Sequence, residues 1–207
     1  MSRGIDLLAI LPALPCNTMN PILDSPTLRA RVSPTTVEEY HRLPERNANG
    51  RRTELIRSIV IEKMSKSALH KALATRLYRR ILALLPDGFS AWKEEPLTFV
   101  DSEPEPDVSV VRGTWSEFET RHASTAELVV EVAVSSIRDD QELASIYAEA
   151  GVAEYWIVVA GARSIEAYRR PESGRYREMR VYGEGEELAA ANVPQLRVVI
   201  ADLFAGL

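Results

Sequence analysis

Residues 128–134 read Leu-Val-Val-Glu-Val-Ala-Val, and this stretch is the strongest indication of the fold class. A short run of branched apolar residues is typical of a strand that is covered on both faces, as in α/β proteins. Glu131 is the only charged residue in the run. Because an isolated buried carboxylate is costly to desolvate, we expect Glu131 to pair with a cation, to bind a metal or to be protonated.

Helical and strand-like segments alternate around this stretch. Residues 137–151 show an amphipathic helical pattern, and residues 154–159 form another apolar strand. A strand, a helix and a strand in this order predict one right-handed crossover with parallel strands. Residues 67–85 carry leucines at helical spacing and predict the longest helix. The pattern predicts an α/β fold with a mixed sheet, and it places the remaining short elements at 35–43 (helix), 53–64 (one or two strands), 90–93, 97–100, 107–112, 115–122 (turn or short helix), 164–169, 176–181 and 196–200.

Composition limits the class of protein. The 207 residues are 45% hydrophobic and 27% charged, which indicates one globular domain, expected at 33–207 behind a loosely ordered leader at 1–32. The single cysteine, Cys16, permits no disulfide within the chain, so a cytoplasmic location is the default. No stretch approaches the length of a membrane span. A net charge of −5 argues against binding through bulk phosphate attraction, but it leaves a metal-dependent nuclease possible.

Asp107 begins a second apolar strand, about two dozen residues before Glu131. Two carboxylates that enter a buried sheet close together repel each other unless a cation lies between them. Magnesium prefers oxygen ligands of this kind and can activate water for hydrolysis. The alternative is that Glu131 pairs with an arginine, such as Arg57 or Arg112, and that Asp107 only begins a strand. Spacing alone leaves both interpretations open.

Two further residues are weaker candidates. Glu54 could point into the same cleft as an outer metal ligand, although an acid near a strand start is more often solvated. His70, at the start of the long helix, could approach a phosphate or a water, although a lone histidine there is more often structural. The sequence contains no zinc-ligand spacing, no phosphate-binding glycine loop and no nucleophile elbow.

The order of several motifs resembles that of the Uma family (Uma-two) of restriction endonucleases, which belongs to the PD-(D/E)XK nuclease superfamily. The match extends over about residues 33–205 and rests on these segments: Arg-Thr-Glu-Leu-Ile (52–56), Met64-Ser65 with His70, Glu-Pro-Leu-Thr-Phe (95–99), Glu-Pro-Asp-Val-Ser-Val-Val (105–111), Leu-Val-Val-Glu-Val (128–132) and Tyr-Ala-Glu-Ala-Gly-Val-Ala-Glu-Tyr-Trp-Ile-Val (147–158). The resemblance implies a restriction endonuclease-like mixed sheet flanked by helices. It also implies a Mg²⁺ (or Mn²⁺) site at Asp107 and Glu131, which Glu54 completes, and DNA as the substrate.

The sequence departs from the family at the catalytic lysine. The superfamily position holds Ala133, and the family position, four residues before Tyr147, holds Leu143. Arg138 is the obvious substitute, although arginine stays charged and shuttles protons poorly. Lys66 and Lys71, near His70, are further candidates.

Two functions therefore remain. The first is a metal-dependent DNA endonuclease, expected to be a homodimer through the aromatic strand at 154–158 and the late hairpin. The second is a catalytically degenerate nuclease-fold protein that binds a metal or a partner.

Overall fold

The computed structural model describes residues 25–44, 47–135 and 137–207. The chain divides into two units, residues 1–34 and residues 35–207. In the first unit, the described part contains the short helix α1 (Pro26–Arg29). Most of the leader predicted at 1–32 and Cys16 lie outside the described residues.

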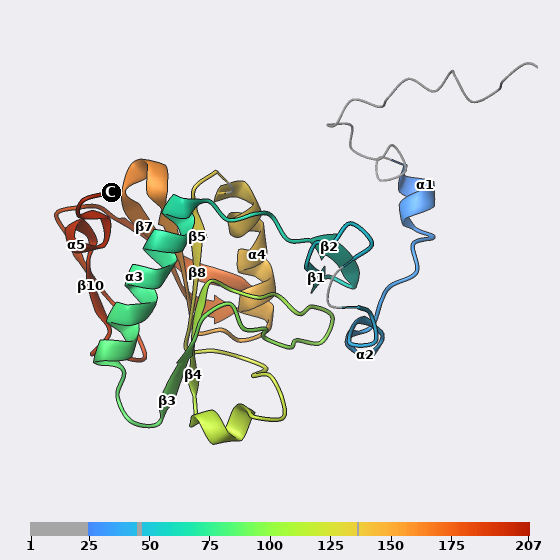
Figure 1. Ribbon diagram of the computed structural model, residues 1–207, viewed down its shortest axis with the longest axis horizontal. Helices are drawn as coiled ribbons and strands as arrows, with labels where there is room; N and C mark the ends of the chain where they lie inside the picture. Colours follow the sequence, from blue (N-terminus) through green and yellow to red (C-terminus); the bar gives the residue numbers. More distant parts are fainter. Residues whose placement is uncertain (1–24, 45–46, 136) are drawn as a thin grey trace, which may run out of the picture. The chain divides into compact units, whose positions relative to one another are not determined.

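The second unit is built on a mixed sheet of six strands in the order β3-β4-β5-β6-β7-β8 (Figure 1). Strand β5 is central, as the sequence predicts, and pairs with β6 in parallel and with β4 in antiparallel fashion. The predicted crossover is the segment that runs from β5 through helix α4 (Ile137–Glu149) to the parallel strand β6. The strands are β3 (Phe89–Trp92), β4 (Val108–Arg112), β5 (Leu128–Ala133), β6 (Glu154–Val159), β7 (Ser164–Glu172) and β8 (Arg175–Tyr182).

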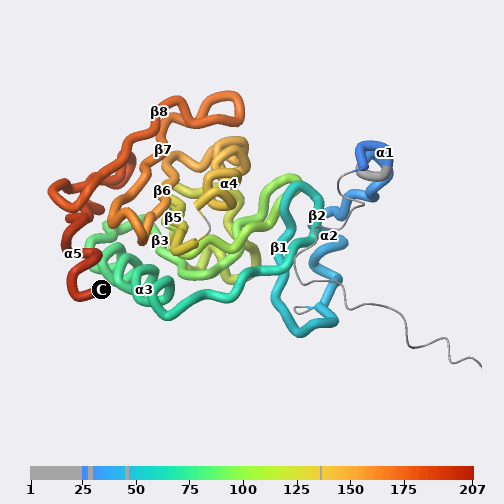
Figure 2. The backbone as a smooth tube through the Cα atoms, turned by 90° about the horizontal axis from the view of Figure 1, so that it is seen from above, coloured from blue at the N-terminus to red at the C-terminus, as the bar shows by residue number. Residues whose placement is uncertain are grey.

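Helices α3 (Ala68–Leu84) and α4 (Ile137–Glu149) lie on opposite faces of this sheet (Figures 1 and 2). Side chains alternate along β5, so Val130 packs in the cluster with α3 and Val129 in the cluster with α4. Glu131 follows the same alternation as Val129 and therefore points to the α4 face.

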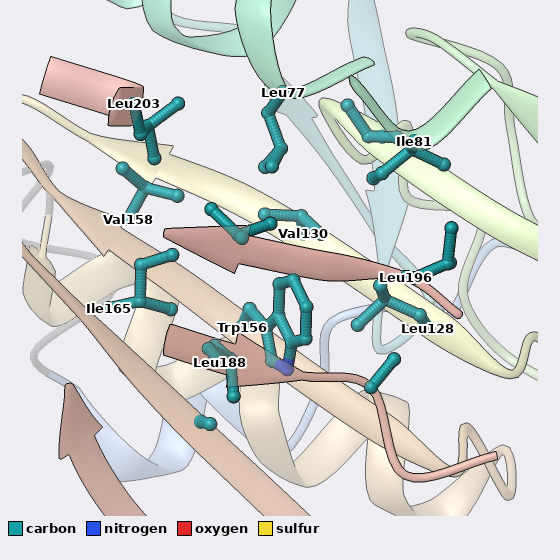
Figure 3. Packing of buried hydrophobic residues seen from close by; sticks show 14 of the residues in the cluster. Leu77, Ile81, Leu128, Val130, Trp156, Val158, Ile165, Leu188, Leu196 and Leu203 are labelled. Carbon is teal, nitrogen blue, oxygen red and sulfur yellow. The ribbon is translucent and has the colours of Figure 1, made fainter. Parts of the chain in front are cut away.

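The core beneath α3 is a continuous apolar layer. Leu77 and Ile81 of α3 pack toward Val130 and Trp156 of the sheet, and Leu203 closes the layer at one end (Figure 3). Leu203 belongs to helix α5 (Ile200–Phe204), which follows a small two-stranded sheet of β9 (Glu187–Ala189) and β10 (Arg197–Val199). This core fixes the strands whose ends carry the candidate site.

A hairpin of β1 (Thr53–Ile56) and β2 (Ile59–Glu62) stands apart from the main sheet, after the short helix α2 (Val37–Tyr40). Its turn residues Arg57 and Ser58 both have positive φ, 51° and 62°, as a two-residue hairpin turn requires. The Arg57 guanidinium forms an ion pair with Glu149 at the end of α4. The hairpin is therefore attached to the helix that covers Glu131.

Several predicted boundaries were wrong. Residues 97–100 form no strand, and Leu97 makes only an isolated bridge with Ala123. The helix predicted at 35–43 is the single turn α2, which a capping box at Thr36 begins. The turn or short helix predicted at 115–122 is confirmed as the 3₁₀ turn η2 (Trp115–Phe118), and a second 3₁₀ turn, η3 (Ala160–Ala162), follows β6. Strand β9 and helix α5 were not predicted.

Candidate active site

The ends of β4 and β5 open into a cleft of about 710 Å³. Asp107, Glu131, Glu54 and His70, four of the predicted site residues, all line it. The register pairs Val108 with Val130, so Asp107, one residue earlier, lies across from Glu131. The Asp107 backbone N–H donates to Glu131 Oε2 at 3.2 Å. The two acids therefore converge on one cleft from separate strands.

Asp107 is almost fully buried, and both of its carboxylate oxygens have polar partners. Lys66 Nζ lies 2.6 Å from its Oδ1, and His70 Nε2 lies 2.9 Å from its Oδ2. The backbone N–H of Val132 also donates to Oδ2, at 2.8 Å. Burial opposes ionisation, but the hydrogen bond from His70 and the charge of Lys66 outweigh it and lower the pKa of Asp107. Asp107 is thus an ionised carboxylate.

Glu131 is in the opposite situation. Its Oε1 accepts a hydrogen bond from the Tyr147 hydroxyl at 2.9 Å, and no cationic side chain of the described residues forms an ion pair with it. Burial, and then the charges of Asp107, Asp140 and Glu54, raise the pKa of Glu131 well above its usual range. The carboxylate therefore lacks a compensating positive charge.

The alternative pairing of Glu131 with an arginine is wrong. Arg57 binds Glu149 and lies 3.9 Å from Asp101, and Arg112 binds Glu127 at 2.9 Å. Both guanidinium groups are directed to partners away from β5.

Glu54 stands in a separate group of charges on the cleft wall. Its Oε1 forms an ion pair with Lys63 Nζ at 2.6 Å and accepts a hydrogen bond from the Glu105 backbone N–H at 3.0 Å. Lys63 also binds the Glu105 carboxylate at 3.0 Å. These contacts join the hairpin to the segment that leads into β4, so Glu54 already has a structural role.

The candidate cations fall into two groups. Arg138 is exposed on the first turn of α4 and is not among the residues that line the cleft, although its neighbour Asp139 is. Lys71 is exposed on α3 and does not line the cleft either. Lys66, in contrast, reaches the predicted acid directly. Sequence reasoning missed its second partner, Glu94, which lies 3.1 Å away just beyond β3.

The oxygen atoms of Asp107 and Glu131 are of the chemical type that binds a hard divalent cation. Carboxylate oxygens are the ligands that Mg²⁺ and Mn²⁺ prefer, and the Glu131 carboxylate has no cationic partner among the described residues. In the described parts of the chain, however, no three His, Cys, Asp or Glu side chains are grouped so that they could hold a metal. An ion at Asp107 would have to displace the contact of Lys66 or His70.

Comparisons with known proteins bear on the family and the fold. Residues 37–201 match the model of the family Uma2, described as "Putative restriction endonuclease". A crystal structure described as a putative nuclease belonging to DUF820, from Anabaena variabilis, superposes with a TM-score of 0.71 at 20% identity and covers 83% of this chain and 98% of that one. A search of curated protein sequences found no match.

The fold is thus restriction endonuclease-like, as the sequence predicted, and the family and fold together support a nuclease. Within the described residues, no helix has both the length and the apolar character to cross a membrane. Since the family model matches most of its length, the chain belongs to the Uma2 family.

Proposed function

We propose that this protein is a metal-dependent endonuclease that hydrolyses phosphodiester bonds in DNA. The observation that carries the proposal is the convergence of Asp107 and Glu131, which meet through the 3.2 Å hydrogen bond and face the same cleft. Structural proteins rarely retain such a pair, because the repulsion between two buried acids lowers stability. A site of this kind is typical of hydrolytic nucleases.

Asp107 and Glu131 would hold Mg²⁺ or Mn²⁺, and Glu54 would support the site from the cleft wall. When bound, such an ion lowers the pKa of a water molecule and stabilises negative charge on the phosphate. Glu131, with which no cationic side chain of the described residues forms an ion pair, would supply the second carboxylate to the ion. His70 holds Asp107 in place through its 2.9 Å contact.

The charge of the cleft explains why a metal would be needed even for binding. Its lining contains only four basic side chains, Arg57, Lys63, Lys66 and His70, against eight acids: Glu54, Glu62, Glu105, Asp107, Glu131, Asp139, Asp140 and Glu142. Such a surface repels the phosphates of DNA. DNA binding should therefore be weak in EDTA and stronger with divalent cations, and exposed Arg138 is a candidate contact for the backbone outside the cleft.

Plasmid cleavage tests the proposal. Purified protein should nick or linearise plasmid with MgCl₂ or MnCl₂ and not with EDTA. Asp107→Asn should remove this activity, whereas Asp87→Asn, which changes an exposed acid beyond α3, should leave it intact. Cleavage that persists unchanged in Asp107→Asn would reject the assigned site.

A second function is favoured by one specific observation: neither Ala133 nor Leu143 carries the cation that the family resemblance leads one to expect. The protein would then keep the fold and bind a metal or a partner without cleaving DNA. Calorimetric titration with Mn²⁺ followed by cleavage assays at high protein concentration separates the two, because binding without nicking supports this second function.

The predicted homodimer needs one correction. Strand β6, the aromatic segment assigned to the interface, lies inside the sheet between β5 and β7 and is almost entirely buried. Only the β7–β8 hairpin, where β8 is an edge strand, remains as a candidate dimer face. We keep the homodimer and, because the proposed substrate is DNA, a cytoplasmic location as parts of the proposal; sedimentation of the purified protein tests the first.

A further inference from the structure

The cleft contains one lysine that is bound to the proposed metal ligand itself. The Lys66 ammonium lies 2.6 Å from Asp107 Oδ1 and 3.1 Å from Glu94 Oε1. Lys63, the other lysine in the lining, is held by Glu54 and Glu105 on the cleft wall. Lys66 is therefore the lysine that can act at the reacting phosphate.

Glu94 is held in place at a conformational cost. Its φ of 57° lies in the left-handed region, which an ordinary side chain adopts only when its surroundings impose it. Its backbone N–H donates to the Asp107 carbonyl at 3.3 Å, and its carboxylate also contacts Lys93 at 3.1 Å. The fold thus fixes a second carboxylate beside Lys66, next to the buried one at Asp107.

The two carboxylates differ in what they can bind. Asp107 is almost fully buried, with 2% of its side chain exposed, whereas Glu94, just beyond β3, is 32% exposed. A divalent cation and an ammonium cannot share Asp107 Oδ1 without strong repulsion. The lysine stem is long and flexible, so its head can leave one carboxylate and keep the other.

We propose that Lys66 is a displaceable cation: it neutralises Asp107 in the metal-free protein, and when a divalent ion takes that place it stays on Glu94 and binds an oxygen of the DNA phosphate. The positions in β5 and α4 at which the family resemblance predicts a cation hold Ala133 and Leu143, which are uncharged. Lys66, just before α3, would supply that positive charge instead. Glu94 is then a positioning residue. This inference rests on the proposed metal site at Asp107 and Glu131.

Lys66→Met tests the inference, because it keeps the apolar stem and removes the ammonium. Lys71→Met is the matched control, since it removes an exposed lysine five residues later. In calorimetry without DNA, Lys66→Met should bind Mn²⁺ about 10-fold more tightly than Lys71→Met, a typical size for coupling between two sites. At saturating Mn²⁺ its plasmid cleavage should fall about 100-fold, as when one preorganised charge is lost from a transition state.

The opposite signs of these two changes distinguish the proposal from a structural role, in which metal binding and cleavage would both weaken. Lys66→Arg retains the charge and should return Mn²⁺ affinity to the wild-type value. Glu94→Gln should weaken Mn²⁺ binding about 3-fold or more, because Lys66 then has Asp107 as its remaining strong partner.

The outcomes separate the two proposals. Wild-type protein that binds Mn²⁺ and cleaves DNA, combined with a Lys66→Met variant that matches Lys71→Met in both assays, overturns the role of Lys66 and leaves the nuclease intact. Wild-type protein that binds no Mn²⁺ overturns both. If Lys66→Met does not fold, as judged by circular dichroism, Lys66→Gln provides the same comparison.

Discussion

Replacement of Glu131 by glutamine should stabilise the metal-free protein while it destroys the metal site. Burial and the charge of Asp107 both oppose ionisation of the Glu131 carboxylate and raise its pKa well above its usual range. Glutamine has nearly the same shape without the charge. Its carbonyl can accept the Asp107 N–H, and its amide can donate to the Tyr147 oxygen, so both observed hydrogen bonds have replacements.

The size of the effect follows from relief of one uncompensated charge in a partly buried site, about 1–2 kcal/mol. For a chain of this length, each kcal/mol raises Tm by about 2–4 °C, so we expect Glu131→Gln to raise Tm by about 2–8 °C in EDTA. The gain must depend on pH. The raised folded-state pKa means that the native protein holds the proton more tightly than the unfolded chain, so wild-type stability falls relative to the variant as pH increases above the ordinary value of 4.5.

Thermal melts from pH 4 to 8 measure this difference. In EDTA the two proteins should melt together near pH 4, and the variant should gain steadily toward pH 8. Added MnCl₂ should then stabilise the wild type, raising its free energy of unfolding by about 2.7 kcal/mol when the Mn²⁺ concentration is 100 times Kd. The stability of the variant should not change. A variant less stable than the wild type at pH 8 in EDTA would refute the reasoning that Glu131 is an uncompensated acid.

Three further substitutions test other parts of the structure. Glu154→Gln should lower the free energy of unfolding, measured in urea, by about 2–4 kcal/mol, because the Arg169 guanidinium, 2.7 Å from the Glu154 carboxylate, would lose its charge partner. Equal urea midpoints for the two proteins would contradict this. Gly174→Ala should lower stability by about 1–2 kcal/mol, since φ is +74° and the new Cβ would lie 2.8 Å from Glu149 Cγ; an unchanged melting temperature would show that the hairpin adapts. Leu143→Lys should raise the rate of plasmid cleavage about 10-fold or more, because position 143 lines the cleft one turn before Tyr147; a rate equal to wild type would mean that a missing lysine does not limit the reaction.

Much of the fold could be predicted because its signals are local. The apolar run around Glu131 gave the central strand, and leucine spacing gave α3 to within a residue at each end. Strand β9 and helix α5 were missed for a physical reason: they are three and five residues long, too short for a periodic pattern.

In the candidate site, too, the residues that could be predicted are those with a local sequence signal. Asp107 and Glu131 could be identified because Asp107 immediately precedes one apolar strand and Glu131 is the one charged residue within another. Glu94 could not, because it lies 13 residues before Asp107 and carries no pattern of its own, and Lys66, 41 residues before Asp107, could be named only as one of two lysines near His70. Only the approach of the α3 N-terminus to the end of β4 shows that a lysine from another element reaches the acid.

If Asp107 and Glu131 share one divalent ion, a crystal soaked in MnCl₂ and measured at a wavelength where manganese scatters anomalously will show where it binds. We expect an anomalous peak within bonding distance of a carboxylate oxygen of each residue, with the Lys66 ammonium moved from Asp107 to Glu94. A well-ordered site with no peak, and with Lys66 still on Asp107 at saturating Mn²⁺, would contradict it.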